Sequence, residues 1–126
     1  MTIADTDVLI DFLSGAEPMA SRVADEIEAG LATTAVSRFE LRAGARTARQ
    51  ERAVAALLDA LVTLPLDPAA ADRAASVRRS LEKAGAGIGM ADSLIAGIVL
   101  TAGAMLLTRN RRHFERVAGL RLAAEG

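Results

Sequence analysis

Short runs of apolar and β-branched residues recur along the chain, separated by longer segments in which apolar positions have a helical spacing. The short runs predict strands, since such residues favour extended backbone and polar or turn-forming residues bound each run. The predicted strands are residues 2–4, 31–36, 62–66, 105–108 and 120–122. The chain therefore starts on a strand and returns to one repeatedly.

The intervening segments carry apolar residues three and four positions apart, the spacing of one helix face. Helices are predicted from Asp7 onward, over 18–30, 37–50, 51–61, 69–84 and 90–102, and as a short segment between 108 and 120. Strands that alternate with helices are typical of an α/β fold with a parallel sheet. At 126 residues the chain has room for one domain. We therefore expect a single three-layer α/β/α domain over 1–126 with a central, mainly parallel sheet.

Composition limits the chemistry that this domain can carry. Hydrophobic residues make up 52% of the chain, enough for a core, whereas aromatic residues make up only 2%. Cysteine is absent and His113 is the single histidine. This excludes disulfide frameworks, thiolate metal sites, thiol nucleophiles and the HExxH zinc motif. A metal site in one chain must then use oxygen ligands, which favours magnesium or manganese.

The charge balance does not by itself indicate a nucleic-acid-binding protein. The formal net charge is −1, whereas phosphate-binding domains tend to be basic. Every basic residue except Lys83 is arginine, which suits bidentate contacts to phosphate. A genome rich in G and C produces the same bias without selection for binding, so this signal is weak.

The N-terminus shows no targeting pattern. The longest uncharged stretch, residues 93–108, is shorter than a membrane-spanning helix requires. We expect a soluble, cytoplasmic protein that does not use a membrane as a partner.

Acidic residues follow the first predicted strand. Ligands of an open parallel sheet bind at the carboxyl ends of its strands, so Asp5 and Asp7 are candidate site residues. The alternative is local: Asp7 caps the following helix and Asp5 lies in a turn. Taken alone, the Asp-x-Asp pattern favours the local interpretation.

Glu40 follows the second strand in the pattern Ser37-x-x-Glu40, a capping box that predicts a helix start near Ser37. The helical wheel favours a different role, because Glu40 points away from a stripe of arginines and lies among small and apolar residues. An acid on such a face needs a partner or a metal. Both interpretations remain open. The stripe consists of Arg38, Arg42, Arg46 and Arg49.

Asp92 is the only charged residue of the predicted helix over 90–102, which is apolar on all sides and therefore buried. An acid in the first turn interacts favourably with the helix dipole, which is the local interpretation. Asp92 also closely follows the glycine-rich segment GAGIG, which favours a position in the lining of a functional site instead. Asn110 follows the fourth strand as a further polar candidate, with a turn as its alternative role.

These acidic and amide side chains would converge on one edge of the sheet. Clustered carboxylates repel one another unless a divalent cation neutralises them. Such a cation also activates water and stabilises charge on a phosphoryl group. Metal-assisted phosphodiester hydrolysis is therefore the reaction class that the pattern favours.

Four segments of the chain resemble the PIN-domain ribonucleases, in particular the VapC-type toxins of bacterial toxin–antitoxin pairs. They are ADTDVLIDFL at 4–13, AVSRFELRAG at 35–44, GMADSLIAGIVL at 89–100 and LLTRNRRHFERVAGL at 106–120. They follow in the family's order and spacing. The resemblance implies an α/β/α fold, a homodimer, Mg²⁺- or Mn²⁺-dependent cleavage of RNA, and inhibition by a small VapB-like antitoxin.

The resemblance also implies roles for individual residues. Asp5, Glu40 and Asp92 match the family's catalytic, metal-binding carboxylates. We expect Asp5 and Asp92 to hold the metal directly, and Glu40 to bind the metal or its water. Asp7 has a supporting role, since the family often has Asn or Ser at that position. Asn110 lies near the place of a fourth acid; it is expected to act in catalysis by orienting water or a metal ligand, and whether a second metal ion binds stays open.

Basic residues near Asn110 are candidates for contacts with RNA phosphates, and the arginine stripe beside Glu40 is a second candidate. The alternative for both is a solvent-exposed charged face. The candidate substrate-binding residues are Thr6, Arg109, Arg111 and Arg112, with Arg116 extending the cluster.

The sequence leaves two rival functions open. A phosphatase of the haloacid dehalogenase type would use Asp5 as its nucleophile, but such enzymes usually need a downstream lysine and a longer chain, and Lys83 lies on a polar helical segment. The other rival is a catalytically weak or inactive PIN-like module that dimerises and binds a partner. Only the missing fourth acid supports it.

Overall fold

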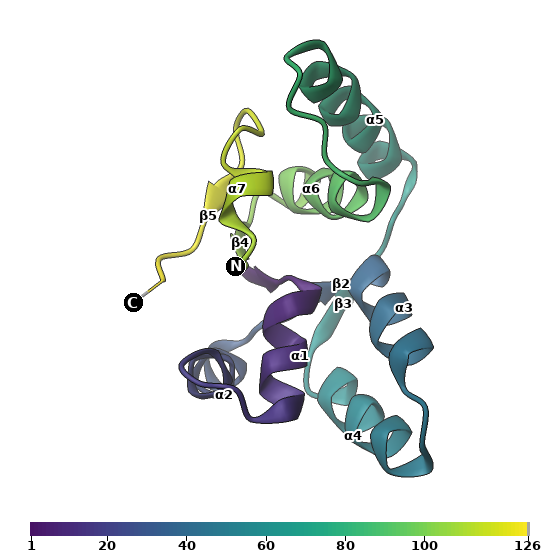
Figure 1. Ribbon diagram of the computed structural model, residues 1–126, viewed down its shortest axis with the longest axis vertical. Coiled ribbons are helices and arrows are strands. Elements are labelled where there is room, and N and C mark those ends of the chain that lie inside the picture. Colours follow the sequence, from purple (N-terminus) through teal and green to yellow (C-terminus); the bar gives the residue numbers. More distant parts are fainter. Residues whose placement is uncertain (126) are drawn as a thin grey trace.

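A central sheet of short strands forms the middle of the molecule (Figure 1). The computed structural model describes residues 1–125. Its strands are β1 (Thr2–Ala4), β2 (Ala32–Thr34), β3 (Val62–Leu64), β4 (Met105–Leu107) and β5 (Arg121–Leu122). They lie in the order β3-β2-β1-β4-β5, and every neighbouring pair is parallel. The predicted α/β class with a parallel sheet is confirmed.

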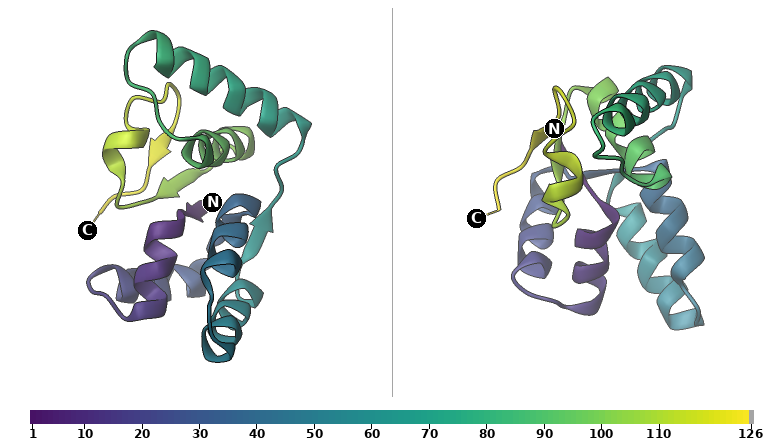
Figure 2. Two further views of the ribbon diagram at one scale, coloured as in Figure 1. Left: turned by 45° about the vertical axis from the view of Figure 1, so that its right-hand side comes forward. Right: turned by 45° about the horizontal axis from the view of Figure 1, so that its top comes forward.

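Helices connect the strands and cover both faces of the sheet (Figure 2). They are α1 (Thr6–Ser14), α2 (Met19–Ala29), α3 (Ala35–Gly44), α4 (Ala48–Asp59), α5 (Pro68–Lys83), α6 (Met90–Ala102) and α7 (Arg111–Phe114). Helices α1 to α4 contribute to the core on one face, and α5 to α7 to the core on the other. Within residues 1–125, none of these helices is long and apolar enough to cross a membrane.

The two faces of the sheet have separate hydrophobic cores because successive strand residues point to opposite sides. Ala4 of β1 and Leu107 of β4 lie in the core shared with α1, α2 and α4. Ile3 and Leu106, one residue earlier on the same strands, lie in the core shared with α5, α6 and α7. The central strands are therefore covered on both sides, as is usual for parallel strands in α/β folds.

Strands β1 and β4 run side by side and end at the same edge of the sheet. Their register pairs Ala4 with Leu107, and the Asp5 backbone N–H donates to the Leu107 carbonyl at 2.9 Å. The next residues of the two segments, Asp5 and Thr108, consequently lie together. The first turns of α1 and α3 start at this carboxyl edge as well.

Helix α1 starts one residue earlier than predicted, and its cap is a different aspartate. Asp5 has extended backbone, and its side chain accepts a hydrogen bond from the Thr6 N–H at 2.8 Å. The expectation that Asp7 caps this helix while Asp5 lies in a turn is wrong. Asp5 therefore has a local role at the helix start in addition to its place at the strand end.

Helix α3 also starts before its predicted position. Thr34 is its N-cap and accepts from the Ser37 N–H at 3.0 Å, so β2 ends at Thr34 and the predicted strand over 31–36 is shorter than expected. The capping box expected from Ser37 and Glu40 is wrong, because Ser37 already lies inside the helix. The Glu40 side chain is therefore not used to cap α3.

The break predicted between the helices over 37–50 and 51–61 lies earlier in the chain than expected. Helix α3 ends at Gly44, and Thr47 caps α4 by accepting from the Gln50 N–H at 3.1 Å. Arg46 lies between the two helices and Arg49 lies on α4. The expected stripe of four arginines on one helix therefore does not form.

Candidate active site

Asp5 lies between the end of β1 and the start of α1. The residue is buried, with 4% of its surface exposed. The Thr6 N–H donates to one carboxylate oxygen at 2.8 Å, and the Thr108 hydroxyl donates to the other at 2.6 Å. Both donors are neutral, so they orient the carboxylate without balancing its charge.

Burial raises the pKa of the Asp5 carboxyl from its ordinary value of 3.8 to about 6. Hydrogen bonds from Thr108 and Thr6 lower this pKa, while the negative charges of Asp7 and Asp92 raise it. The influence of two further carboxylates indicates that acidic side chains gather at this edge of the sheet. A bound cation would stabilise the ionised form of such a group.

Asp7 lies in the first turn of α1 and faces the residues that follow β4. The Arg109 backbone N–H donates to its Oδ2 at 3.1 Å, and the Thr108 hydroxyl lies 3.5 Å from the same oxygen. The Asp7 Oδ1 atom is buried and has no hydrogen-bond partner among the described residues. Burial is the main cause that raises the pKa of Asp7. A cation or water molecule at this position would satisfy the unpartnered oxygen.

A chain of hydroxyl groups holds Glu40. The Thr6 hydroxyl donates to Glu40 Oε1 at 2.6 Å and accepts from the Ser37 hydroxyl at 2.8 Å. The Thr34 hydroxyl lies 3.3 Å from that of Ser37, and both of these residues are fully buried. Thr6 therefore connects two acids, with its backbone on Asp5 and its side chain on Glu40. No sequence pattern indicates this network of hydroxyl groups, because Ser37 fits the position of a helix cap.

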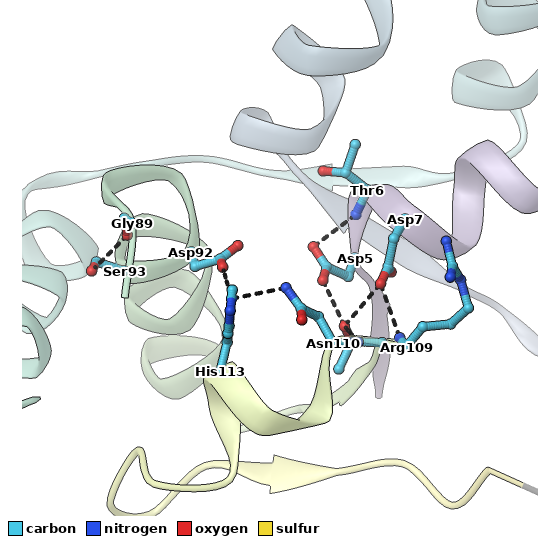
Figure 3. Close-up of polar contacts among 10 residues, drawn as sticks. Asp5, Thr6, Asp7, Gly89, Asp92, Ser93, Arg109, Asn110 and His113 are labelled. Carbon is cyan, nitrogen blue, oxygen red and sulfur yellow. Dashed lines mark hydrogen bonds and ion pairs between the residues drawn. The ribbon is translucent and has the colours of Figure 1, made fainter. Parts of the chain in front are cut away.

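Asp92 enters the site from the first turn of α6 (Figure 3). The His113 Nδ1 atom lies 2.7 Å from Asp92 Oδ2, and the Asn110 Nδ2 atom lies 2.8 Å from the same ring nitrogen. Asn110 lies between Asp92 and Asp5 in this view (Figure 3). No sequence pattern places His113 in the site, and the one signal is that it is the single histidine of the sequence.

The structure thus gathers Asp5, Asp92 and Asn110 at one edge (Figure 3). It also connects Glu40 to Asp5 through Thr6. Within residues 1–125, no three acidic or histidine side chains form a ready metal-binding cluster. Each carboxylate is oriented by its own hydrogen-bond donors instead.

The predicted phosphate-binding arginines differ in how they are engaged. Arg109 forms an ion pair with Asp11, with Nε 2.6 Å from Oδ2. Arg111 pairs with Glu125 at 3.5 Å. Arg112 is exposed and forms no ion pair within the described part of the chain. Its guanidinium group is therefore the most available of the three to a phosphate.

The donor atoms at this edge suit a hard divalent cation. Carboxylate oxygens come from both sides of the site, one of them buried and unpartnered, and Asn110 adds an amide group. Oxygen ligands of this kind are those that Mg²⁺ and Mn²⁺ prefer. The side chains therefore fit a divalent metal, and a cation would offset the repulsion that contributes to the raised pKa of Asp5.

The fold and the acidic edge define an α/β protein with a carboxylate site at the carboxyl ends of a parallel sheet. The family model described as PIN domain matches residues 2–120. The chain belongs to the PIN-domain family.

Relatives with established names support this placement. The chain is 31% identical over 122 residues to the tRNA(fMet)-specific endonuclease VapC of Shigella flexneri, covering 93% of this chain and 92% of the relative. It is 33% identical over 116 residues to Ribonuclease VapC19 of Mycobacterium tuberculosis, covering 90% and 92%. Among solved structures, DNA-bound VapBC from Salmonella typhimurium matches with a TM-score of 0.83 at 25% identity, covering 97% of this chain and 96% of the other.

Proposed function

We propose that this chain is a divalent-metal-dependent endoribonuclease of the VapC type, which hydrolyses RNA phosphodiester bonds as the toxin of a toxin–antitoxin pair. Its family and its relatives, a VapC endonuclease and a VapC ribonuclease, support the nuclease activity. The family match over residues 2–120 supports one PIN domain over 1–126. An RNA substrate favours action in the cytoplasm.

The buried carboxylate of Asp5 carries the proposal. Its two hydrogen bonds come from neutral groups, and its pKa is raised to about 6 by burial, with further contributions from Asp7 and Asp92. Such a group is unfavourable in an empty site but suits a site that receives a cation. Its position at the carboxyl edge of the sheet is where open α/β folds bind ligands.

Asp5 and Asp92 are the residues that would hold Mg²⁺ or Mn²⁺ directly, with Glu40 on the metal or on the attacking water. A divalent cation bound there lowers the pKa of water and stabilises charge on the phosphoryl group. Thr6 and Thr108 fix the orientation of Asp5.

The remaining polar groups serve the reacting water. The Thr6 hydroxyl holds one oxygen of Glu40, so the other oxygen is left to orient the water. Asn110 lies between the acids from the two sides and orients a second water molecule or a metal ligand (Figure 3). Glu40 and Asn110 therefore act by holding water molecules or metal ligands in position.

The proposed RNA-binding residues lie around this edge. Arg112 is exposed and unpaired within residues 1–125, so it is the leading candidate for a phosphate contact. Arg109 and Arg111 would have to exchange their carboxylate partners for a phosphate. The Thr6 hydroxyl donates its hydrogen to Glu40, so it could contact the substrate only as an acceptor or by giving up this bond.

A small VapB-like antitoxin is the proposed protein partner. The Salmonella relative was solved as a VapBC assembly. Beside Glu40, a cleft of about 400 Å³ lies between α1, α3 and α4, and its lining is largely apolar, including Ile10, Leu13 and Val54. Apolar side chains of a partner helix suit such a cleft, which would bring the antitoxin to the edge of the site.

A second copy of the chain is the other proposed partner. Phe39 of α3 and Met90 of α6 are 70% and 66% exposed, which is unusual for large apolar side chains. They line the same shallow hollow, which also includes Val36 and Leu94. We propose that this surface, defined by Phe39 and Met90, forms the homodimer interface.

The proposed activity is tested by incubating purified protein with total cellular RNA in the presence of Mg²⁺, Mn²⁺ or EDTA. Asp5→Asn and Asp92→Asn are run in parallel. Asp72→Asn is the matched control, because Asp72 is an exposed acid on α5 and has no place in the site. We expect discrete fragments that require metal, that persist in the control, and that fall to the EDTA background in both site variants.

Fragments that persist in both site variants would contradict the proposed site. Folded wild-type protein that cleaves no RNA with either metal would contradict the enzyme, and would favour the PIN-like binding module instead.

A further inference from the structure

His113 of α7 contacts Asp92 of α6 across the site. The His113 Nδ1 atom is 2.7 Å from Asp92 Oδ2, and the two side chains are 48% and 22% exposed. His113 is the only histidine of the chain, and the roles assigned above do not include it. An exposed ion pair of this kind contributes little to stability, so the contact is better explained by an effect on Asp92.

The chemistry of the two groups fixes the direction of their hydrogen bond. An ionised carboxylate only accepts, so Nδ1 carries the hydrogen and donates it to Asp92 Oδ2. The structure places Asn110 Nδ2 at 2.8 Å from this ring nitrogen, which cannot accept a hydrogen bond once it carries a hydrogen; this tautomer therefore requires the flipped Asn110 amide, with its carbonyl oxygen toward the ring. Among the described residues, Oδ2 is the Asp92 oxygen that is hydrogen-bonded, which leaves Oδ1 for a ligand.

The backbone around His113 is anchored at both ends. Phe114, the next residue, is fully buried in the core beneath α7. On the other side, the Asn110 N–H donates to Thr108 Oγ1 at 2.9 Å, and this hydroxyl donates to Asp5 at 2.6 Å. Residues 108–113 therefore connect the carboxylates of Asp5 and Asp92 through a continuous set of contacts (Figure 3).

We propose that His113 is a positioning residue that holds the Asp92 carboxylate in the orientation in which it shares one divalent cation with Asp5. This inference rests on the proposed function, because it assumes that the two acids hold a metal. A group that hydrogen-bonds a metal-ligating carboxylate fixes its orientation, and losing such a group typically weakens metal binding by about 10- to 100-fold. The segment 108–113 thus orients the carboxylates of Asp5 and Asp92, whereas a fourth acid at this place would add a negative charge to the site.

The test is the affinity of the full-length, metal-free protein for Mn²⁺, measured by isothermal titration calorimetry at pH 7.5. We expect His113→Ala to weaken Mn²⁺ binding by about tenfold or more. His113→Asn should restore most of the affinity, because its amide nitrogen occupies nearly the place of Nδ1. His113→Gln should not, because its amide lies one carbon further out.

Two further variants calibrate this experiment. Asp92→Asn shows the loss expected when the ligand itself is removed. Arg78→Ala is the matched control, because it removes the partner of a surface carboxylate, Glu82, on α5 and should leave Mn²⁺ affinity unchanged. Circular dichroism checks that each variant is folded.

A spectroscopic readout does not depend on metal. Because His113 is the only histidine, its ring ¹⁵N signals are unambiguous. We expect the neutral ring to carry its hydrogen on Nδ1 in the wild type, and Asp92→Ala to release this preference. A wild-type ring with its hydrogen on Nε2 would overturn the proposal.

The calorimetric outcomes distinguish a failure of the positioning role of His113 from a failure of the proposed metal-dependent function. Mn²⁺ binding that Asp92→Asn weakens but His113→Ala leaves intact would overturn the positioning role alone. Equal loss in His113→Ala and His113→Asn would reduce His113 to a packing role and overturn the proposal. Wild-type protein that binds no Mn²⁺ would overturn the proposed function, and the positioning role with it.

Discussion

Asp5 combines burial with hydrogen bonds from the Thr6 N–H and the Thr108 hydroxyl, both of which are neutral. These donors orient the carboxylate and lower its pKa, but burial outweighs them, and the pKa rises to about 6. Ionisation of the buried Asp5 carboxyl therefore lowers the stability of the metal-free protein, whereas the same carboxylate suits the binding of a cation. Asp7 repeats the arrangement, with one buried oxygen that has no partner within residues 1–125.

The raised pKa of Asp5 predicts how the stability of the metal-free protein depends on pH. Because the folded protein favours the protonated carboxyl, this group's contribution is fully present below the ordinary pKa of 3.8 and is lost as pH rises through about 6. A shift of about two units corresponds to about 3 kcal/mol. In EDTA, the unfolding free energy of the wild type should fall by roughly that amount relative to Asp5→Asn between pH 4 and 7.5.

Urea unfolding of the two proteins across this pH range measures the difference directly. Adding Mn²⁺ at pH 7.5 should stabilise the wild type more than Asp5→Asn. Parallel pH profiles for the two proteins would show that Asp5 ionises without cost.

At the scale of elements, the position of Asp92 depends on how α6 packs against α5. The two helices approach each other closely at Gly97. A Cβ atom added there would lie 2.5 Å from the Ala70 carbonyl oxygen and 2.7 Å from Ala74 Cβ. Because both neighbours belong to α5, neither moves without shifting that helix. The glycine therefore lets α6 sit close enough to bring Asp92 to the edge of the sheet.

This packing predicts opposite effects for two glycine substitutions. Gly97→Ala should lower the unfolding free energy by about 1–3 kcal/mol, the usual cost of overpacking, and should reduce RNA cleavage by displacing Asp92. Gly44→Ala on α3 is the control, because nothing lies within 4 Å of its added Cβ and alanine favours a helix by up to about 1 kcal/mol. Equal stability of the two variants would contradict the account of the α5–α6 contact.

At the scale of the whole molecule, the acidic edge lies close to the surface defined by Phe39 and Met90. Phe39 directly precedes Glu40, and Met90 starts the helix that carries Asp92. Burial of this surface between two copies would bring their acidic sites near each other. The proposed dimer would therefore affect the surroundings of the acidic site as well as the stability of the chain.

Sedimentation velocity at micromolar concentration tests the proposed interface. We expect a dimer for the wild type, and Phe39→Asp should raise the dimer dissociation constant by about tenfold or more, because a buried aromatic contact is replaced by a charge. Ile10→Asp is the control, since Ile10 is an exposed apolar residue of α1 on the separate cleft. A monomeric wild type, or equal effects of both substitutions, would contradict this interface.

Most elements of the fold could be predicted because their signals are local. The helix Met90–Ala102 matches its prediction at both ends, since glycines at 89 and 103 bound an uninterrupted apolar segment. The position of the break between α3 and α4 could not be predicted from periodicity, because alanine and arginine continue the helical pattern through it. The competing interaction is the cap that Thr47 makes with the Gln50 N–H.

Asp5 and Glu40 of the candidate site could be predicted because they come after β1 and β2, and Asp92 because it is the only charge of an apolar helix. The groups that hold them could not, because their contacts join distant segments. Ser37 fits a capping box by sequence, yet its hydroxyl lies 2.8 Å from that of Thr6. His113 reaches Asp92 only because α7 packs beside α6, which no local pattern reveals.

We propose that the catalytic metal binds between the carboxylates of Asp5, at the end of β1, and Asp92, in the first turn of α6. Crystals soaked in Mn²⁺ and measured at a wavelength where manganese scatters anomalously locate the bound ion. We expect an anomalous peak in contact with the carboxylates of Asp5 and Asp92, and its loss in Asp5→Asn. A peak elsewhere on the protein, or one that persists in Asp5→Asn, would contradict this proposal.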